Sequence, residues 1–155
     1  MPALLQRIQK SDRGVEKRVV TSLIVSDKVI SELYPFLKPE LFELEVSQLV
    51  VRWTLEYYNQ WRSAPKIQIK DLFEFHKHEV KLTLQEEVSQ FLAKLSEEYL
   101  SEGGPEGVND DFLIDQGKKY LKERRMRKLV SDVNTFLDLG QLEKAEEIYE
   151  KENRI

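Results

Sequence analysis

A helical pattern that runs from about Asn109 to Asp138 changes the side of its apolar face near its middle. At roughly 100° per residue, the first half gathers small and apolar residues on one face: Leu113, Gly117, Tyr120 and Leu121. The second half gathers its apolar residues on another face: Met126, Leu129, Val130, Val133, Phe136 and Leu137. One straight helix cannot offer both faces to a single core. Either the helix kinks near residues 122–125, or its halves pack against different bodies.

The end of the sequence favours the second possibility. A last helix, from Gln141 to about Glu152, has its own apolar face, and only Leu139 and Gly140 separate it from the long helix. So short a connection makes the two helices antiparallel neighbours. Because a projecting helical hairpin buries little of itself, we expect it to self-associate, forming a dimer through the hairpin. The residues expected in the hairpin core and its dimer contact are Leu129, Val133, Phe136, Leu142 and Ile148.

Helical periodicity also describes the preceding residues. Val15, Val19 and Leu23 recur at fourfold spacing, which places them on one helical face. Ser26 is in position to cap a short second helix, and a broad apolar stripe extends from residue 44 to residue 61. A short helix over 69–76 follows, and Thr83 with Glu86 forms a capping-box pattern.

These segments predict an all-α protein, a compact helical bundle followed by a C-terminal antiparallel helical hairpin. The expected divisions are an N-terminal tail (1–14), a helical head (15–108), a helical hairpin (109–152) and the start of a linker or chain end (153–155).

Composition limits the class of protein. The chain has 155 residues, enough for a single domain with its own core, and it has no cysteine, which excludes disulfide scaffolds and thiolate metal sites. Mean hydropathy is -0.51, and no apolar run approaches the roughly 18 residues of a membrane helix. The N-terminus lacks the apolar region of a signal peptide. We therefore expect a cytoplasmic, soluble protein.

No motif points to catalysis, so we expect no enzyme activity, catalytic residue, metal or cofactor in this chain. The phosphate-binding pattern G-x-x-x-x-G-K-[ST] is absent, and the glycine cluster of residues 103–107 lies in an acidic connector. His76 and His78 stand two apart, which turns their side chains to different sides of a helix. We expect His76 to be partly buried and hydrogen-bonded, and His78 to be exposed.

A basic run is the strongest local anomaly. Seven cations against the single Glu123 give +6 within residues 118–128 of a protein whose net charge is -4. The cations are Lys118, Lys119, Lys122, Arg124, Arg125, Arg127 and Lys128. They spread around the helix, which favours a solvated face or contacts with a partner protein. Contact with a nucleic-acid backbone is the alternative. The aromatic residues of 53–61 follow the apolar stripe and are expected in the core.

Several stretches together resemble the N-terminal domain of replicative DNA helicases of the DnaB type, especially forms encoded by phages. They are Glu16-Lys17-Arg18-Val19-Val20-Thr21-Ser22-Leu23-Ile24-Val25-Ser26, then Trp53-Thr54-Leu55-Glu56-Tyr57-Tyr58 with Ala64-Pro65, and finally Phe112-Leu113-Ile114-Asp115 through Tyr120 and Arg124-Arg125 to Gly140-Gln141-Leu142-Glu143-Lys144-Ala145. The similarity is one of helices and spacings over about residues 15–152.

The resemblance implies a non-catalytic assembly and partner-binding domain. In that family a helical head precedes a hairpin, and hairpins pair between subunits to build a collar that supports a hexameric ring and contacts primase and the helicase loader. ATP hydrolysis belongs to a separate domain, and no P-loop occurs in this chain. A small nucleic-acid-binding accessory protein that uses the basic run is the alternative function.

Overall fold

The computed structural model describes residues 2–99 and 109–153. Within these residues it contains seven α-helices and no strand, which confirms the all-α prediction. The α-helices are α1 (Pro2–Val25), α2 (Asp27–Leu33), α3 (Glu45–Trp61), α4 (Ile69–His76), α5 (Leu82–Tyr99), α6 (Asp110–Asp138) and α7 (Leu142–Asn153). Short 3₁₀ helices connect them: η1 (Tyr34–Phe36), η2 (Pro39–Leu41), η3 (Lys66–Gln68) and η4 (Lys77–Glu79).

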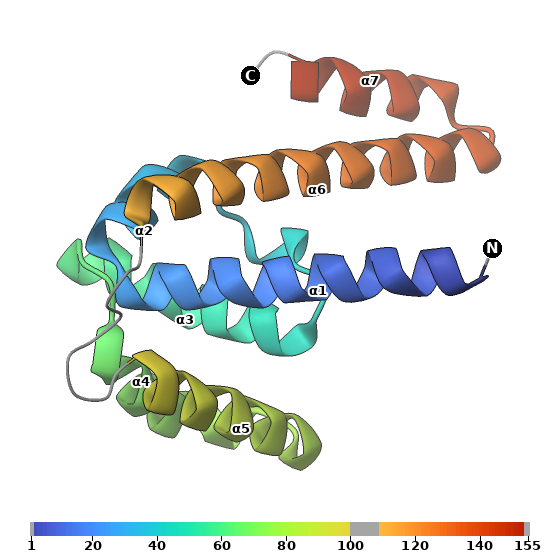
Figure 1. Ribbon diagram of the computed structural model, residues 1–155. Coiled ribbons are helices and arrows are strands. Elements are labelled where there is room, and N and C mark those ends of the chain that lie inside the picture. The colour runs from blue at the N-terminus through green and yellow to red at the C-terminus, as the bar shows by residue number, and fades with distance from the viewer. Residues whose placement is uncertain (1, 100–108, 154–155) are drawn as a thin grey trace.

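The helices form a compact bundle followed by an antiparallel hairpin, as predicted. In Figure 1, α1 and α3 lie at the centre, and α4 with α5 lies on one side of them. The long helix α6 crosses the opposite side, where it contacts α1, α2, η1 and η2, and α7 folds back along α6. We call α1 to α5 with their 3₁₀ helices the head, and α6 with α7 the hairpin.

The core of the head is built from the helical faces that periodicity predicts. Val19 and Leu23 of α1 meet Val29 and Ile30 of α2, and all four are almost fully buried. Other segments supply further fully buried side chains of this core, including Leu33, Phe42, Val50, Ile69 and Leu121. α6 contributes only residues of its first half to this cluster. This half of α6 therefore covers the side of the head core that faces it.

Several helix ends follow from local sequence. The Ser26 hydroxyl accepts a hydrogen bond from Val29 N at 3.2 Å and caps α2. Gly140, at φ 73°, ends α6: its own N–H donates to the carbonyl of Leu137, and the next N–H donates to that of Phe136. This pair of bonds is a Schellman motif, which glycine adopts without steric cost.

Other boundaries differ from the expectation. α5 begins at Leu82, so Thr83 lies within the helix and the predicted capping box is wrong. The side chain of Gln85 instead donates to the carbonyl groups of Lys77 and Val80, at 2.7 and 2.6 Å. α1 begins at Pro2 and so extends over residues 2–14, the expected tail. The glycine cluster of 103–107 and the end of the chain, residues 154–155, lie outside the described residues.

Candidate interaction site on the helical hairpin

The two halves of α6 have different surroundings, which settles the choice left open by the sequence. α6 is continuous from Asp110 to Asp138. Its buried residues, Ile114, Gly117, Tyr120 and Leu121, all lie in the first half, against the head. Beyond them the helix packs on α7, and Arg124 still bonds the head at the carbonyl of Leu41. The change of apolar side therefore marks the joint between head and hairpin.

A buried carboxylate organises this joint. Glu16 of α1 is completely buried, and its oxygens accept hydrogen bonds from the hydroxyl of Tyr120 at 2.6 Å and that of Ser47 at 3.1 Å. They also accept the backbone N–H groups of Glu43 and Leu44, at 2.5 and 3.1 Å. These groups surround the start of α3, where a negative charge is favoured by the helix dipole. Glu16 therefore joins α1, the start of α3 and α6.

Two further contacts fix α6 on the head. The Arg124 guanidinium donates to the carbonyl of Leu41 at 2.8 Å. A side chain at Gly117 would meet Leu33, since an added Cβ would lie 2.5 Å from its Cδ1. Burial, followed by the hydrogen bond to Glu16, raises the pKa of Tyr120 well above its ordinary value of 10.0. The phenol therefore stays protonated and can donate to the carboxylate.

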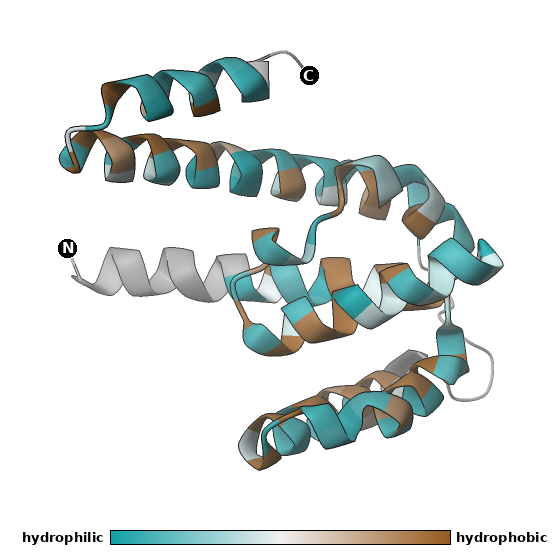
Figure 2. Cartoon of the chain, turned by 180° about the vertical axis from the view of Figure 1, so that it is seen from behind, coloured by the Kyte–Doolittle hydropathy of each residue, from teal (hydrophilic) through white to brown (hydrophobic). Residues whose placement is uncertain are grey.

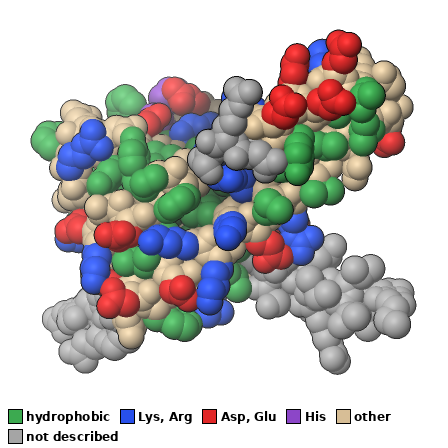
Figure 3. Space-filling model, turned by 90° about the horizontal axis from the view of Figure 1, so that it is seen from above, with side chains coloured by type: hydrophobic (Ala, Val, Ile, Leu, Met, Phe, Trp, Pro, Cys, Tyr) green, Lys and Arg blue, Asp and Glu red, His purple; other side chains and the backbone are tan. Residues whose placement is uncertain are grey.

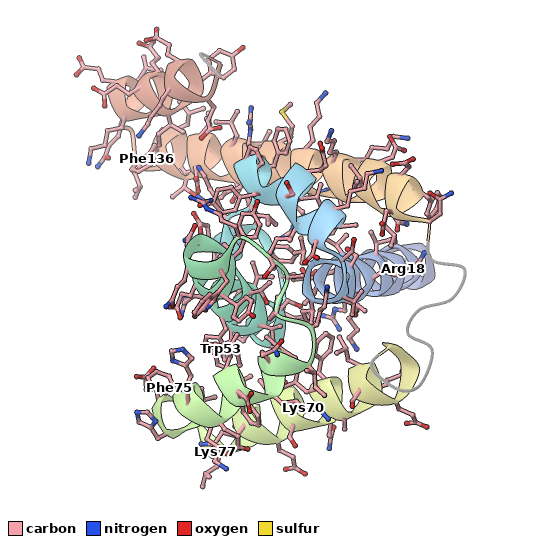
Figure 4. All side chains as sticks on the ribbon, turned by 90° about the vertical axis from the view of Figure 1, so that its left-hand side faces the viewer. Arg18, Trp53, Lys70, Phe75, Lys77 and Phe136 are labelled. Carbon is pink, nitrogen blue, oxygen red and sulfur yellow. The ribbon has the colours of Figure 1, made fainter. Side chains whose placement is uncertain are left out.

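The interior of the hairpin is thin. Ala145 of α7 is buried against α6, and Ile148 is half-buried. On α6, Leu129, Val133 and Phe136 are also half-buried. The Lys144 ammonium lies 5.6 Å from the ring centroid of Phe136, which Figure 4 labels on the hairpin, and Arg125 pairs with Glu152 at 3.4 Å. Four of the five residues predicted for self-association thus contribute to the hairpin interior, while Leu142 is 59% exposed.

The hairpin also has large apolar side chains that are exposed. We call this set the hairpin face: Met126, Val130 and Leu137 of α6, and Leu142 and Tyr149 of α7, each 46–59% exposed. Their spacings place each set on one side of its helix, about a quarter-turn from the residues that pack between α6 and α7. Because the helices are antiparallel, that quarter-turn carries both sets to the same side of the hairpin. Hydrophobic residues recur along both helices in Figure 2, and Figure 3 shows them beside the acidic side chains of α7.

The basic run is largely engaged within the chain. Lys119, Arg125, Arg127 and Lys128 pair with Asp115, Glu152, Glu123 and Asp132, and Arg124 bonds the carbonyl of Leu41. Lys118 and Lys122 are exposed. The run therefore acts mainly in local ion pairs and in attaching α6 to the head.

The head places the aromatic and histidine residues largely as expected. Trp53 and Tyr58 are buried, whereas Trp61 is 61% exposed, so the core prediction is wrong for Trp61. His76 is mostly buried: its ring stacks on Trp53, with centroids 5.6 Å apart, and its Nε2 lies 3.3 Å from Glu56. His78 is exposed, as expected.

Sequence reasoning missed Glu16 as a structural centre, although a signal exists. Glu16 stands three and four residues before Val19 and Val20, and therefore on their buried face. A charged residue on such a face requires a polar network.

No metal centre emerges, because no group of three or more His, Asp or Glu in the described residues is arranged to hold an ion. No helix in the described part of the chain has the length and apolar character of a membrane crossing. Comparisons with protein-family models, curated proteins and solved structures found no match for this chain.

Proposed function

We propose that this chain is a non-catalytic assembly module that dimerises by packing the hairpin face of one copy against that of another. The observation that carries the proposal is the exposure of five large apolar side chains on one side of a two-helix projection. Apolar area of this kind, gathered on one surface, is typical of association sites. A second hairpin would cover it and complete a four-helix arrangement.

The spacing along α6 supports a helical partner. Met126, Val130, Val133 and Leu137 alternate by four, three and four residues, which is the repeat of a coiled-coil seam. Val133 also belongs to the hairpin interior, whereas Met126, Val130 and Leu137 are exposed and remain available for a second copy. A C2 pairing would bring the same surface from both copies together.

The resemblance to the N-terminal domain of DnaB-type helicases provides a context for this proposal. In that context the paired hairpins form part of a collar next to a separate ATPase domain, and the head offers surfaces to primase or to a helicase loader. The division into a head and a hairpin with an uncovered apolar face is consistent with it.

The test is sedimentation velocity on the wild type and two variants over a range of concentrations up to tens of micromolar. Val130→Glu places a charge in the hairpin face, and Thr135→Glu places the same charge on an exposed position of the opposite side of α6. We expect a dimer for the wild type and Thr135→Glu, and a monomer of unchanged helix content for Val130→Glu. A monomeric wild type, or unchanged association of Val130→Glu, would refute the proposal.

Val130 is a better target than Phe136. A charge at Phe136 would also weaken self-association, but the ring lies inside the hairpin beside Lys144. Its replacement would therefore disturb the α6–α7 contact and the dimer together.

The nucleic-acid alternative receives less support. Five of the seven cations in the basic run already have partners in the chain, and the two others, Lys118 and Lys122, make a small electrostatic footprint. Salt-dependent binding to single-stranded DNA that is lost in a Lys118→Gln, Lys122→Gln variant would favour this alternative.

A further inference from the structure

A second surface lies on the head, far from the hairpin face. A groove of about 530 Å³ separates α1 from α5 and is closed at one side by the start of α3. We call it the head groove. α1 lines it with Gly14, Lys17, Arg18 and Thr21, at the spacings of a single helical face. α5 lines it with residues of a single face as well: Glu87, Gln90, Phe91, Lys94 and Leu95. In Figure 4, Arg18 is labelled on α1, above α5.

The shape of the groove suits a helix. Each wall presents about two turns of one helix, a length near 10 Å, to the same open space. An ideal Cβ at Gly14 would have no atom within 4 Å, so the α1 backbone can be approached closely there. Val46 and Phe91 are half-buried and, with the buried Leu95, give the groove an apolar floor. Helices that dock in grooves insert apolar side chains from one face in this way.

The charges that line the groove indicate which edge of a docked helix would be acidic. Lys17 and Arg18 stand together on the α1 wall, with no acidic lining residue on that wall, and within the described residues neither makes an ion pair. The opposite wall is mixed, since α5 carries both Glu87 and Lys94, and Glu45 stands at the start of α3. Complementary charge is therefore required over α1 only.

We propose that the head groove binds an amphipathic helix of another protein, with its apolar side on Val46 and Phe91 and a row of carboxylates over Lys17 and Arg18. The chain's own acidic helix is not suited to this role. α7 turns Ala145 and Ile148 toward α6, so it cannot bring that apolar side into a groove without opening the hairpin.

The experiment is a selection from a displayed library of helical 20-residue peptides. One face of each peptide varies among Leu, Phe and Ala, and the two edges vary among Glu, Lys and Gln. The bait is the full chain, and the counter-bait is the Lys17→Glu, Arg18→Glu variant. A matched control, Lys118→Glu with Lys122→Glu, makes the same charge change on exposed positions of α6.

We expect enriched peptides with Glu on one edge only. Their binding should weaken at least tenfold, about 1.4 kcal/mol, in the Lys17→Glu, Arg18→Glu variant and stay unchanged in the α6 control. Amide NMR shifts of the full chain should map the peptide to α1, α5 and the start of α3. No enrichment, enrichment without an acidic edge, or shifts confined to α6 and α7 would each overturn the proposal. The Val130→Glu variant changes the hairpin face and leaves the head groove intact. Peptide binding to the groove can therefore be measured whether or not the chain dimerises.

Discussion

Removing the Glu16 carboxylate should be among the most destabilising single changes in the head. In Glu16→Ala the hydroxyls of Ser47 and Tyr120 and the N–H groups of Glu43 and Leu44 all lose their acceptor. A buried donor without a partner costs about 1–3 kcal/mol. The two hydroxyls can rotate to other acceptors, and removing a buried charge recovers part of its desolvation energy. The two backbone N–H groups cannot move to another acceptor, so we expect a net loss of about 2–6 kcal/mol.

Tyr120→Phe isolates one bond of the network. It removes a single donor to a charged acceptor and keeps the ring, so the expected loss is about 2 kcal/mol. If the two residues act through their mutual hydrogen bond, the losses in Glu16→Gln and Tyr120→Phe will not add in the double variant. The coupling should be about 1 kcal/mol.

The assay is urea unfolding followed by circular dichroism at neutral pH, at two protein concentrations so that any contribution from association is recognised. Glu43→Ala is the control, because that side chain is partly exposed and pairs with Arg13 only at 3.7 Å. It should change stability by less than about 0.5 kcal/mol. If Glu16→Ala is no more destabilising than Glu43→Ala, the account of the joint is wrong.

Four other perturbations test the joint and other parts of the structure. The pKa of Tyr120 is raised in the folded protein, so its contribution to stability is complete below about pH 10 and is lost as the pH rises further. In alkaline urea titrations, the free energy of unfolding of Tyr120→Phe should therefore fall less with pH than that of the wild type. Hydrogen bonding from the backbone of Ala64, and then from Lys66, lowers the pKa of Asp27. This residue therefore stabilises the fold above its ordinary pKa of 3.8 and loses that effect as the pH falls below it. In Asp27→Asn, the free energy of unfolding should decrease less at acid pH than in the wild type. Gly14→Ala, in an open helical position, should stabilise by about 0.5–1 kcal/mol in thermal unfolding, whereas Gly117→Ala should destabilise by about 1 kcal/mol because its Cβ would overlap the buried Leu33.

The sequence predicts those parts of the fold that depend on local chemistry. The Ser26 cap and the short connection at Leu139 and Gly140 are properties of a few consecutive residues, and the structure contains them. The change of apolar side in α6 predicts the joint, because periodicity reports which face of a helix is covered. The capping box at Thr83 fails because α5 begins one residue earlier, at Leu82, which places Thr83 inside the helix and not at its N-cap.

Tertiary partners lie beyond such reasoning. Glu16 and Tyr120 are 104 positions apart, and the chain has 28 acidic residues. The local sequence does not indicate which of these carboxylates accepts a hydrogen bond from the Tyr120 hydroxyl. The head groove depends likewise on how far α1 and α5 stand apart, which the pattern of neither helix encodes. The division between hairpin interior and hairpin face is only partly predictable. The helical wheel of α6 shows both sets of apolar residues, but it does not say which set contacts α7.

The charge of the basic run has a different consequence once its partners are known. Seven cations on one helix would oppose the close approach of a second copy. Asp115, Glu123, Asp132 and Glu152 each pair with one of them, so seven minus four leaves +3 near the joint. Three of these acids are on α6 itself and the fourth is supplied by α7, which means that folding of the hairpin forms the fourth ion pair. The positive charge that remains lies toward the head, whereas the hairpin face extends away from it to the turn at Gly140. Repulsion between two basic runs is therefore weakest where the apolar side chains would meet, and the distribution of charge along α6 is compatible with pairing through that end of the molecule.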